Sequence, residues 1–341
     1  MEKKAMLFIL LLFVFFALIV ALLLFGPVEI EPSQVIKILF AGDQGAVGRD
    51  SIFWNYRIPK MLTAIAAGGA MALSGLLMQT YFQNPLAGPF VLGINSGATL
   101  GVAAWIIGIS LLPDLGWLSF SGAGGVIAAA VGAMATLIIV ILLSTWVSGK
   151  ATLLIVGLIF GYIANGLINV MVITSSSQEL QSLLLWSLGS FTRVSGHQLV
   201  ILLLIVTIGV ALAITLSKRL NVMLLGDLYA ISSGINIALV KLGVIVITGT
   251  LCGAVTALCG PVAFLGIVAP HLTKVLFNSH DHRILIPAVF LMGAVLAMGA
   301  ELLISTWSHF TLPLNAILGI LGAPAIIFYL LRTRKQMRQM E

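Results

Sequence analysis

The side chains that could carry out chemistry are few in this sequence and lie far apart. Of its 341 residues, 8% are charged and five are histidine. The phosphate-binding pattern GxxxxGK[ST] does not occur, so we expect no nucleotide to bind this chain by that mechanism. The hydrolase patterns HExxH and GxSxG are also missing from the sequence. An enzyme is therefore disfavoured, and any energy from ATP must come from another protein.

Two groups of residues resemble metal sites only superficially. His280, Asp281 and His282 are closely spaced, but a solvated loop in which Asp281 begins a helix explains them equally well, because a carboxylate is stabilised at a helix N-terminus. Cys252 and Cys259 are seven residues apart in an apolar segment and match neither a zinc pair nor a CxxC motif. We predict no metal site.

Glu301 is the one acid that we place well inside an apolar segment. An ionisable group in the bilayer usually faces the interior of the bundle or a transport pathway. Glu301 therefore either joins neighbouring helices or contributes to a substrate or proton route.

A loop at residues 217–236 combines apolar and turn-forming residues. Leu224, Leu225, Leu228 and Ile231 have helical spacing, and glycines lie on both sides of the last two. The pattern predicts a short amphipathic helix. Such a helix either lies on lipid or inserts into a groove of a partner.

Long apolar runs occupy nearly all the rest of the chain. Hydrophobic residues make up 60% of it, whereas a soluble domain has roughly 25% charged residues. Each run of about 20 apolar residues can cross a hydrocarbon core ~30 Å thick. We predict an all-α, polytopic membrane protein with a single transmembrane domain over residues 1–341 and about ten helices, at 5–26, 57–81, 90–110, 121–147, 151–173, 196–216, 237–258, 262–278, 284–307 and 313–332. The first segment is too long for a cleaved signal peptide.

The basic residues predict the orientation. Ten crossings put both termini on one side of the membrane. If that side is the cytoplasm, it holds all the basic residues except Lys37, Arg49, Arg57, Lys60 and Arg193, as the positive-inside rule requires. Topology therefore explains the net charge of +6 better than nucleic-acid binding does. Arg57 and Lys60 are either interfacial anchors or a basic docking site for an acidic partner outside.

Two helix-breaking pairs fall at predicted membrane depth. Asn84-Pro85 and Gly260-Pro261 are tolerated there only if they are buried in protein or line a wet cavity. The segment 88–94 also resembles 260–267, and each copy begins a span, as in the inverted repeats of transporters.

Together these motifs resemble the FecCD-type permeases, the membrane subunits of importers for iron-siderophores, haem and cobalamin. The resemblance covers nearly the whole chain. It is carried by Arg57-Ile-Pro-Lys60, Ser74-Gly75, Gln79, Asn84-Pro-Leu-Ala87, Pro89, Leu92-Gly93, Gly97-Ala98, Leu225-Gly-Asp227 with Ala230 and Gly234, Gly260-Pro261, Phe264-Leu-Gly266, Pro270-His271-Leu, Asp281-His-Arg283, Pro287, Leu312-Pro313 and Gly322-Ala-Pro324.

The resemblance implies a type II ABC importer permease with ten helices and several partners. These are a second permease subunit, identical or paralogous, two cytoplasmic ATPase subunits that bind ATP and Mg, and an extracytoplasmic substrate-binding protein. It implies that residues 217–236 couple to the ATPase, that Arg57 and Lys60 dock the binding protein, and that further motif residues have structural or gating roles. The coupling residues are Leu224, Leu225, Gly226, Asp227, Ala230 and Gly234, and the structural or gating residues are Gln79, Asn84, Pro85, Pro89, Gly93, Gly260, Pro261, Pro270, His271 and Glu301.

Several positions depart from the family pattern. The family often has an Arg after the acid of the ninth span, and this chain has Ser305 and Thr306 near that place. Lys60 stands where the family has Arg, which replaces a bidentate grip with a point charge. Glu301 replaces the usual Asp, and Thr311 replaces the usual Glu before Leu-Pro. Docking and other local features can therefore differ from better-known members.

The function expected from the sequence is ATP-driven import of an iron-siderophore complex across the bacterial inner membrane. Two permease subunits are expected to enclose a central pathway that is lined by the fifth and tenth spans and by the outer segment 180–190. Haem and cobalamin are the alternative substrates, and an ion-coupled secondary transporter is the alternative class, although it would need more ionisable groups within the spans.

Overall fold

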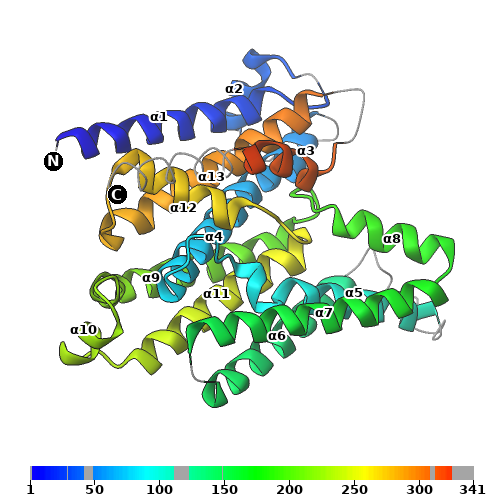
Figure 1. Cartoon of the computed structure of the whole chain (residues 1–341). Helices are drawn as coiled ribbons and strands as arrows, with labels where there is room; N and C mark the ends of the chain where they lie inside the picture. Colours follow the sequence, from blue (N-terminus) through cyan, green and yellow to red (C-terminus); the bar gives the residue numbers. More distant parts are fainter. Residues whose placement is uncertain are drawn as a thin grey trace.

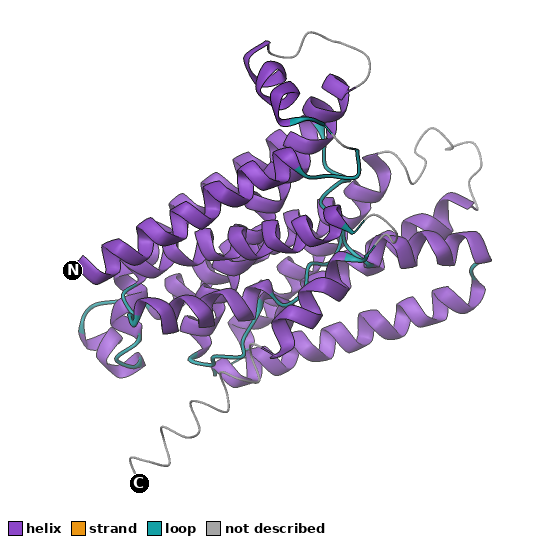
Figure 2. Ribbon diagram, turned by 90° about the horizontal axis from the view of Figure 1, so that it is seen from above, coloured by secondary structure: helices purple, strands orange, loops and turns teal. Residues whose placement is uncertain are grey.

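The computed structural model describes residues 2–28, 30–41, 49–110, 123–147, 149–307 and 312–324. Within these ranges the regular elements are helices, and no strand occurs (Figure 2). The all-α fold predicted from the apolar runs is confirmed.

Seven helices of the described residues are long and apolar enough to cross a membrane. A helix in lipid satisfies its backbone hydrogen bonds internally, which is why long apolar segments take this form. These helices are α1 (Glu2–Leu24), the helix that contains α4 (Ile58–Phe82), α6 (Ala123–Trp146), α7 (Lys150–Thr174), α9 (Gly196–Met223), α11 (Ile237–Cys259) and α13 (His282–Thr306).

Three shorter apolar helices match the remaining predicted spans. They are α5 (Ile94–Ser110), α12 (Leu265–Phe277) and the last helix, Leu314–Pro324. The 13 residues of α12 rise only about 20 Å, which is less than the ~30 Å hydrocarbon core. Each of the ten predicted spans thus coincides with an apolar helix, although 325–332 of the last span lie outside the described residues.

One predicted boundary was wrong. We expected the sixth span to end at 216 and a loop to follow from 217, but α9 continues to Met223. Leu216, Leu220 and Met223 are buried at helical spacing, so packing extends the helix beyond the run of purely apolar residues. The coupling loop is therefore shorter than 217–236.

The centre of the bundle is α4, which packs against α9, α11, α12 and α13. Glycines permit this close packing. A Cβ on Gly68 would lie 2.4 Å from the carbonyl oxygen of Gly293 on α13, and one on Gly75 would lie 1.6 Å from that of Gly266 on α12. Small residues let helix backbones approach closely in lipid, as the sequence suggested.

Short helices lie at both ends of the bundle. The helices α2 (Pro32–Ala41) and α3 (Arg49–Ile52) and the π-helix Phe53–Arg57 precede α4, and α8 (Ser177–Ser187) follows α7. Figure 1 shows the N-terminus and α10 (Asp227–Ser232) at one end, and α8 at the other. We call these the α10 end and the α8 end.

Candidate functional site

The connection between α9 and α11 forms the short helix that the sequence predicted. Glycines with positive φ flank α10, with Gly226 at +103° and Gly234 at +77°. Left-handed backbone is the conformation that glycine adopts at little cost, so the two glycines fix the limits of the helix. The Asn236 side chain then accepts a hydrogen bond from the Leu239 amide and begins α11.

One face of this connection is buried and the other is apolar and exposed. Ala230 is fully buried against the bundle, whereas Leu228 is 86% exposed and Leu225 66%. Tyr229 and Ile231 are also more than half exposed. We call Leu225, Leu228, Tyr229 and Ile231 the α10 knob. Exposed apolar side chains on such a short helix contact either lipid or a groove of a partner protein.

Polar contacts anchor the base of the α10 knob to two long helices. Lys150 Nζ, at the start of α7, lies 2.6 Å from Asp227 Oδ1 at the start of α10. Gln83 at the end of α4 donates to the carbonyl oxygen of Met223 at 3.1 Å. The knob is therefore linked to both α7 and α4, and a push on it can reach them.

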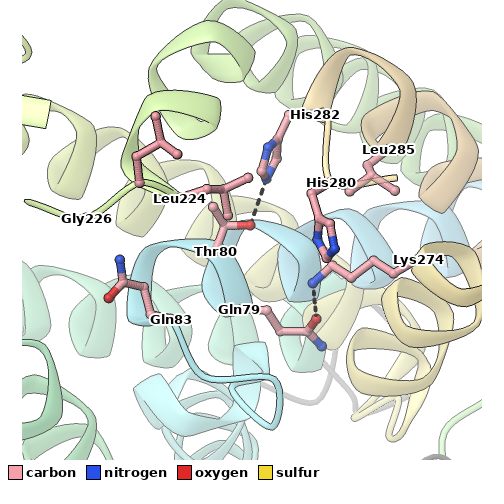
Figure 3. A pocket seen from close by; sticks show the side chains of 10 residues that line it. Gln79, Thr80, Gln83, Leu224, Gly226, Lys274, His280, His282 and Leu285 are labelled. Carbon is pink, nitrogen blue, oxygen red and sulfur yellow. Dashed lines mark hydrogen bonds between the residues drawn. The ribbon is translucent and has the colours of Figure 1, made fainter. Parts of the chain in front are cut away.

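A cleft of about 430 Å³ opens behind the α10 knob (Figure 3). We call it the inner cleft. Its walls come from the end of α4, the turn before α10, α12 and the start of α13. The lining residues are Gln79, Thr80, Gln83, Leu224, Leu225, Gly226, Lys274, His280, His282 and Leu285.

His282 joins two helices across one wall of the inner cleft. Its Nε2 lies 2.7 Å from Thr80 Oγ1, and its Nδ1 lies 2.7 Å from Asn221 Oδ1. Asn221 Nδ2 in turn donates to Asp281 Oδ1 at 2.6 Å. Because the Asn221 oxygen can only accept, His282 Nδ1 carries a proton. Asn221 was missed from the sequence, because an isolated Asn at a helix end gives no signal of its distant partner.

Asp281 begins α13, as the sequence predicted. Its side chain accepts a hydrogen bond from the Arg283 amide. This bond is the main cause, with a second from Asn221, that lowers the pKa of the Asp281 carboxyl from its ordinary value. Both Asp281 and His282 are thus engaged in protein contacts.

Two predicted gating residues hold the opposite wall. Gln79 Oε1 accepts a hydrogen bond from Lys274 Nζ at 2.9 Å, and Gln79 Nε2 lies 3.3 Å from His271 Nδ1 (Figure 3 shows the first contact). His271 and Pro270 are buried in α12. These residues connect α4 to α12 at the α10 end.

Both helix breaks lie where the sequence placed them, and the turn that follows the first break packs against the start of α12. Pro89 begins a 3-10 turn, Pro89–Leu92, that precedes α5, and the loop that starts at Gly260-Pro261 precedes α12. A Cβ on Gly266 would lie 2.7 Å from Pro89 Cδ. Gly93 has φ of +72°, and a Cβ there would lie 2.9 Å from the Gly157 carbonyl oxygen. Asn84 Oδ1 accepts a hydrogen bond from the Leu86 amide across Pro85.

A residue absent from our predictions, Asn315, holds the second break. Its side chain accepts from the Ala263 amide at 2.9 Å and donates to the carbonyl oxygens of Pro261 and Ser187 at 2.8 and 3.2 Å. Next to it, Phe264 has a φ of +65°, which is uncommon for a bulky residue. Asn315 therefore ties the last helix, the break and the end of α8 together.

Arg57 is buried at the α8 end. Its guanidinium donates to the carbonyl oxygens of Leu23 and Leu24 at 2.6 and 3.1 Å, and also to that of Val28. Arg57 therefore caps the C-terminus of α1, where the last carbonyl oxygens lack partners within the helix. Docking of a binding protein through Arg57 stays a prediction, and it would require this side chain to leave its present partners.

Lys60 and Glu301 form a buried ion pair between α4 and α13. Lys60 Nζ lies 3.1 Å from Glu301 Oε1 and donates to Ser305 Oγ at 2.8 Å. The Ser305 hydroxyl is also hydrogen-bonded to the Glu301 carbonyl oxygen. This geometry favours the first interpretation of Glu301, a contact between helices, and it leaves Lys60 engaged within the bundle.

Comparison with known proteins places this arrangement in a family. The model of the FecCD transport family matches residues 10–332. The chain belongs to the FecCD transport family. FecCD proteins are ABC permease subunits of bacteria, so the protein is a polytopic transport component of the inner membrane that works with ATPase and binding-protein partners and is not itself an enzyme.

Named relatives are similar over most of their length. The chain is 34% identical to the hemin transport system permease HmuU of Yersinia pestis over 84% of both chains. It is 36% identical to the vitamin B12 import system permease BtuC of Klebsiella pneumoniae over 82% of both chains.

A solved structure has the same fold. A metal-chelate type ABC transporter in an inward-facing conformation superposes with a TM-score of 0.80, at 24% identity, and covers 94% of this chain and 97% of its own. This likeness confirms the type II importer permease fold expected from the sequence.

Proposed function

We propose that this FecCD permease imports an iron-siderophore complex, driven by ATP hydrolysis on two cytoplasmic subunits and supplied by an extracytoplasmic binding protein. The observation that carries the proposal is the α10 knob. It is apolar, exposed and anchored by the Lys150–Asp227 pair and the Gln83 hydrogen bond to helices that cross the bundle. ATP and Mg bind the partner subunits in this proposal.

The α10 knob transmits the ATPase cycle to the membrane helices. Closure of the ATPase pair pushes Leu225 and Leu228, and the push reaches α7 through Lys150 and α4 through Gln83. The α4 helix packs directly on α12 and α13. The pathway between two permease subunits, identical or paralogous, then alternates between outward and inward access.

The proposed orientation puts the α10 end and both termini in the cytoplasm. Lys4, in the first turn of α1, donates to Ser279 in the turn between α12 and α13 at 3.2 Å, so the N-terminus lies at the α10 end. Of the basic residues left on the other side, Arg57 and Lys60 are buried in internal contacts, and Arg193 donates to the carbonyl oxygens of Leu185 and Trp186 at the end of α8. These three positive charges are therefore engaged in contacts within the protein.

Haem or vitamin B12 is the second candidate substrate class, because the two relatives above are named for hemin and vitamin B12. Selectivity in this scheme resides largely in the binding protein. Competition between a labelled ferric siderophore, haem and cobalamin for uptake separates the candidates. Membership in an ABC permease family argues against the ion-coupled alternative.

Uptake into sealed vesicles tests the proposal. Vesicles that hold the permease and its ATPase, with the loaded binding protein outside, are expected to accumulate substrate only when ATP is supplied on the ATPase side. Leu228→Asp should abolish uptake, whereas Ser232→Asp adds the same charge on α10 without removing an apolar contact and should retain most of it. Uptake by the permease alone without ATP contradicts the proposal.

A further inference from the structure

Lys274 differs from the two lysines that form ion pairs in the described part of the chain. Lys60 lies 3.1 Å from a carboxylate oxygen of Glu301, and Lys150 lies 2.6 Å from one of Asp227. Within the part of the chain that the structure describes, these are the ion pairs that occur. Lys274 instead donates to a neutral amide oxygen, that of Gln79, at 2.9 Å. A partly buried ammonium without a counter-ion is costly, so an anion that reached it would be held.

The inner cleft around Lys274 is suited to an anion. Lys274, His280 and His282 line it, and none of its described lining residues is acidic. Asp227 pairs with Lys150, and Asp281 accepts from Asn221 and begins α13, so both carboxylates have partners of their own. Both nitrogens of His282 are already bonded. Lys274, which gives Gln79 only one of its three N–H groups, and the exposed His280 are therefore the donors for an incoming anion.

The place of the inner cleft indicates which anion. Leu224, Leu225 and Gly226 form one of its walls, and Leu225 is also part of the α10 knob. A protein that contacts the knob therefore lies beside one wall of the cleft. The cleft opens between helix ends and polar turns, beside the α12–α13 turn (Figure 3). A side chain carried by the protein on the knob reaches it directly.

We propose that the inner cleft is a socket for a carboxylate side chain of the ATPase subunit, held by Lys274 and His280. The interface then has two parts, an apolar knob on the permease and an acidic side chain on the ATPase that enters the socket behind it. The socket is bounded by α4, α12 and α13, so an occupied socket links the ATPase to these helices as well as to α10. This inference rests on the proposed function, because it requires an ATPase on the knob.

Binding of the ATPase to the permease in nanodiscs tests the socket. The affinity of the ATPase for the permease is measured at increasing salt concentration in discs of neutral phosphatidylcholine. Wild type is compared with Lys274→Gln, Lys274→Arg and Lys218→Gln. Lys218 is an exposed basic residue near the end of α9 that leads into α10. Its replacement by Gln changes the net charge as much as Lys274→Gln does and serves as the control. Lys274→Gln should weaken binding about tenfold at low salt and flatten its salt dependence, because one close charge pair is lost. Lys274→Arg and Lys218→Gln should bind the ATPase about as tightly as wild type. Lys274→Gln should melt no lower than wild type, because it removes a charge that has no counter-ion in the permease alone.

Three outcomes separate the possibilities. If wild type and Lys274→Gln bind the ATPase with the same affinity and salt slope, the socket is wrong and the proposed function stands. If phosphatidylglycerol in the discs weakens binding to wild type but not to Lys274→Gln, the cleft holds a lipid headgroup and the socket is again wrong. If wild type binds no ATPase at all, the proposed function fails and the socket fails with it.

Discussion

Removal of the Glu301 charge tests how α4 and α13 are held together at the α8 end of the bundle. At 3.1 Å the Lys60–Glu301 attraction is about 5 kcal/mol at an effective dielectric constant of 20. Glu301→Gln leaves the Lys60 ammonium buried, but Ser305 still accepts one of its hydrogen bonds at 2.8 Å. We therefore expect a loss of about 3 kcal/mol, at the lower end of the range for breaking one side of a buried pair.

The double variant distinguishes an ion pair from two independent side chains. Lys60→Met should cost a similar amount alone, because it leaves the Glu301 carboxylate buried without its cation. Combined with Glu301→Gln it should restore most of the lost stability, since replacing both charges of a buried pair is often nearly neutral. Unfolding of the purified protein in detergent is measured for wild type, both single variants and the double variant. The four stabilities together give the coupling free energy between Lys60 and Glu301.

The same variants decide the role of Glu301. If Glu301 joins helices, Glu301→Gln should retain nearly full uptake in vesicles once equal amounts of folded protein are compared. A Glu301→Gln protein as stable as wild type but without uptake would refute the reasoning and place Glu301 on the transport route. Strictly additive losses in the double variant would show that the pair does not act as a unit.

Three further predictions concern packing, the second helix break and pH. Gly75→Ala should lower the melting temperature strongly, because its methyl group would overlap a carbonyl oxygen of α12. Gly299→Ala should leave the melting temperature unchanged, because a Cβ there meets nothing within 4 Å. Equal effects of the two variants would contradict the packing. Asn315→Ala should speed hydrogen exchange of the Ala263 amide, whose acceptor it removes, and unchanged protection would show another acceptor. The pKa of the Asp281 carboxyl is lowered in the folded state. The carboxylate therefore stabilises the fold at pH values above its ordinary pKa, and this stabilisation is lost as the pH falls through the lowered pKa. Asp281→Asn should therefore lose less stability than wild type below about pH 4, and identical pH profiles would contradict this.

The elements with local signals could be predicted from the sequence. Apolar runs gave the positions of the spans, Gly226 and Gly234 gave the limits of α10, and Asp281 gave the start of α13. In each of these cases the cause lies within a few residues of the effect. The end of α9 was misplaced because Leu220 and Met223 pack on distant helices, which a hydropathy window does not register.

Long-range pairings could not be predicted. Lys60 and Glu301 stand out separately as charges near the membrane, but nothing in either segment shows that the two meet across 241 residues. Arg57 looked like a group that faces outward, yet the end of α1 offers its unpaired carbonyl oxygens within reach. Asn221 and Asn315 give no signal alone, because their roles consist entirely of partners brought together by the fold.

Cross-linking at Leu228 tests most directly whether the α10 knob receives the force that drives transport. A thiol probe on Leu228→Cys is selective, because the native Cys252 and Cys259 are fully buried and Leu228 is 86% exposed. During ATP-driven uptake the probe should cross-link to the ATPase subunit, and the yield should change between the ATP-bound and nucleotide-free states. Cross-links to phospholipid alone while substrate is being delivered would contradict the account.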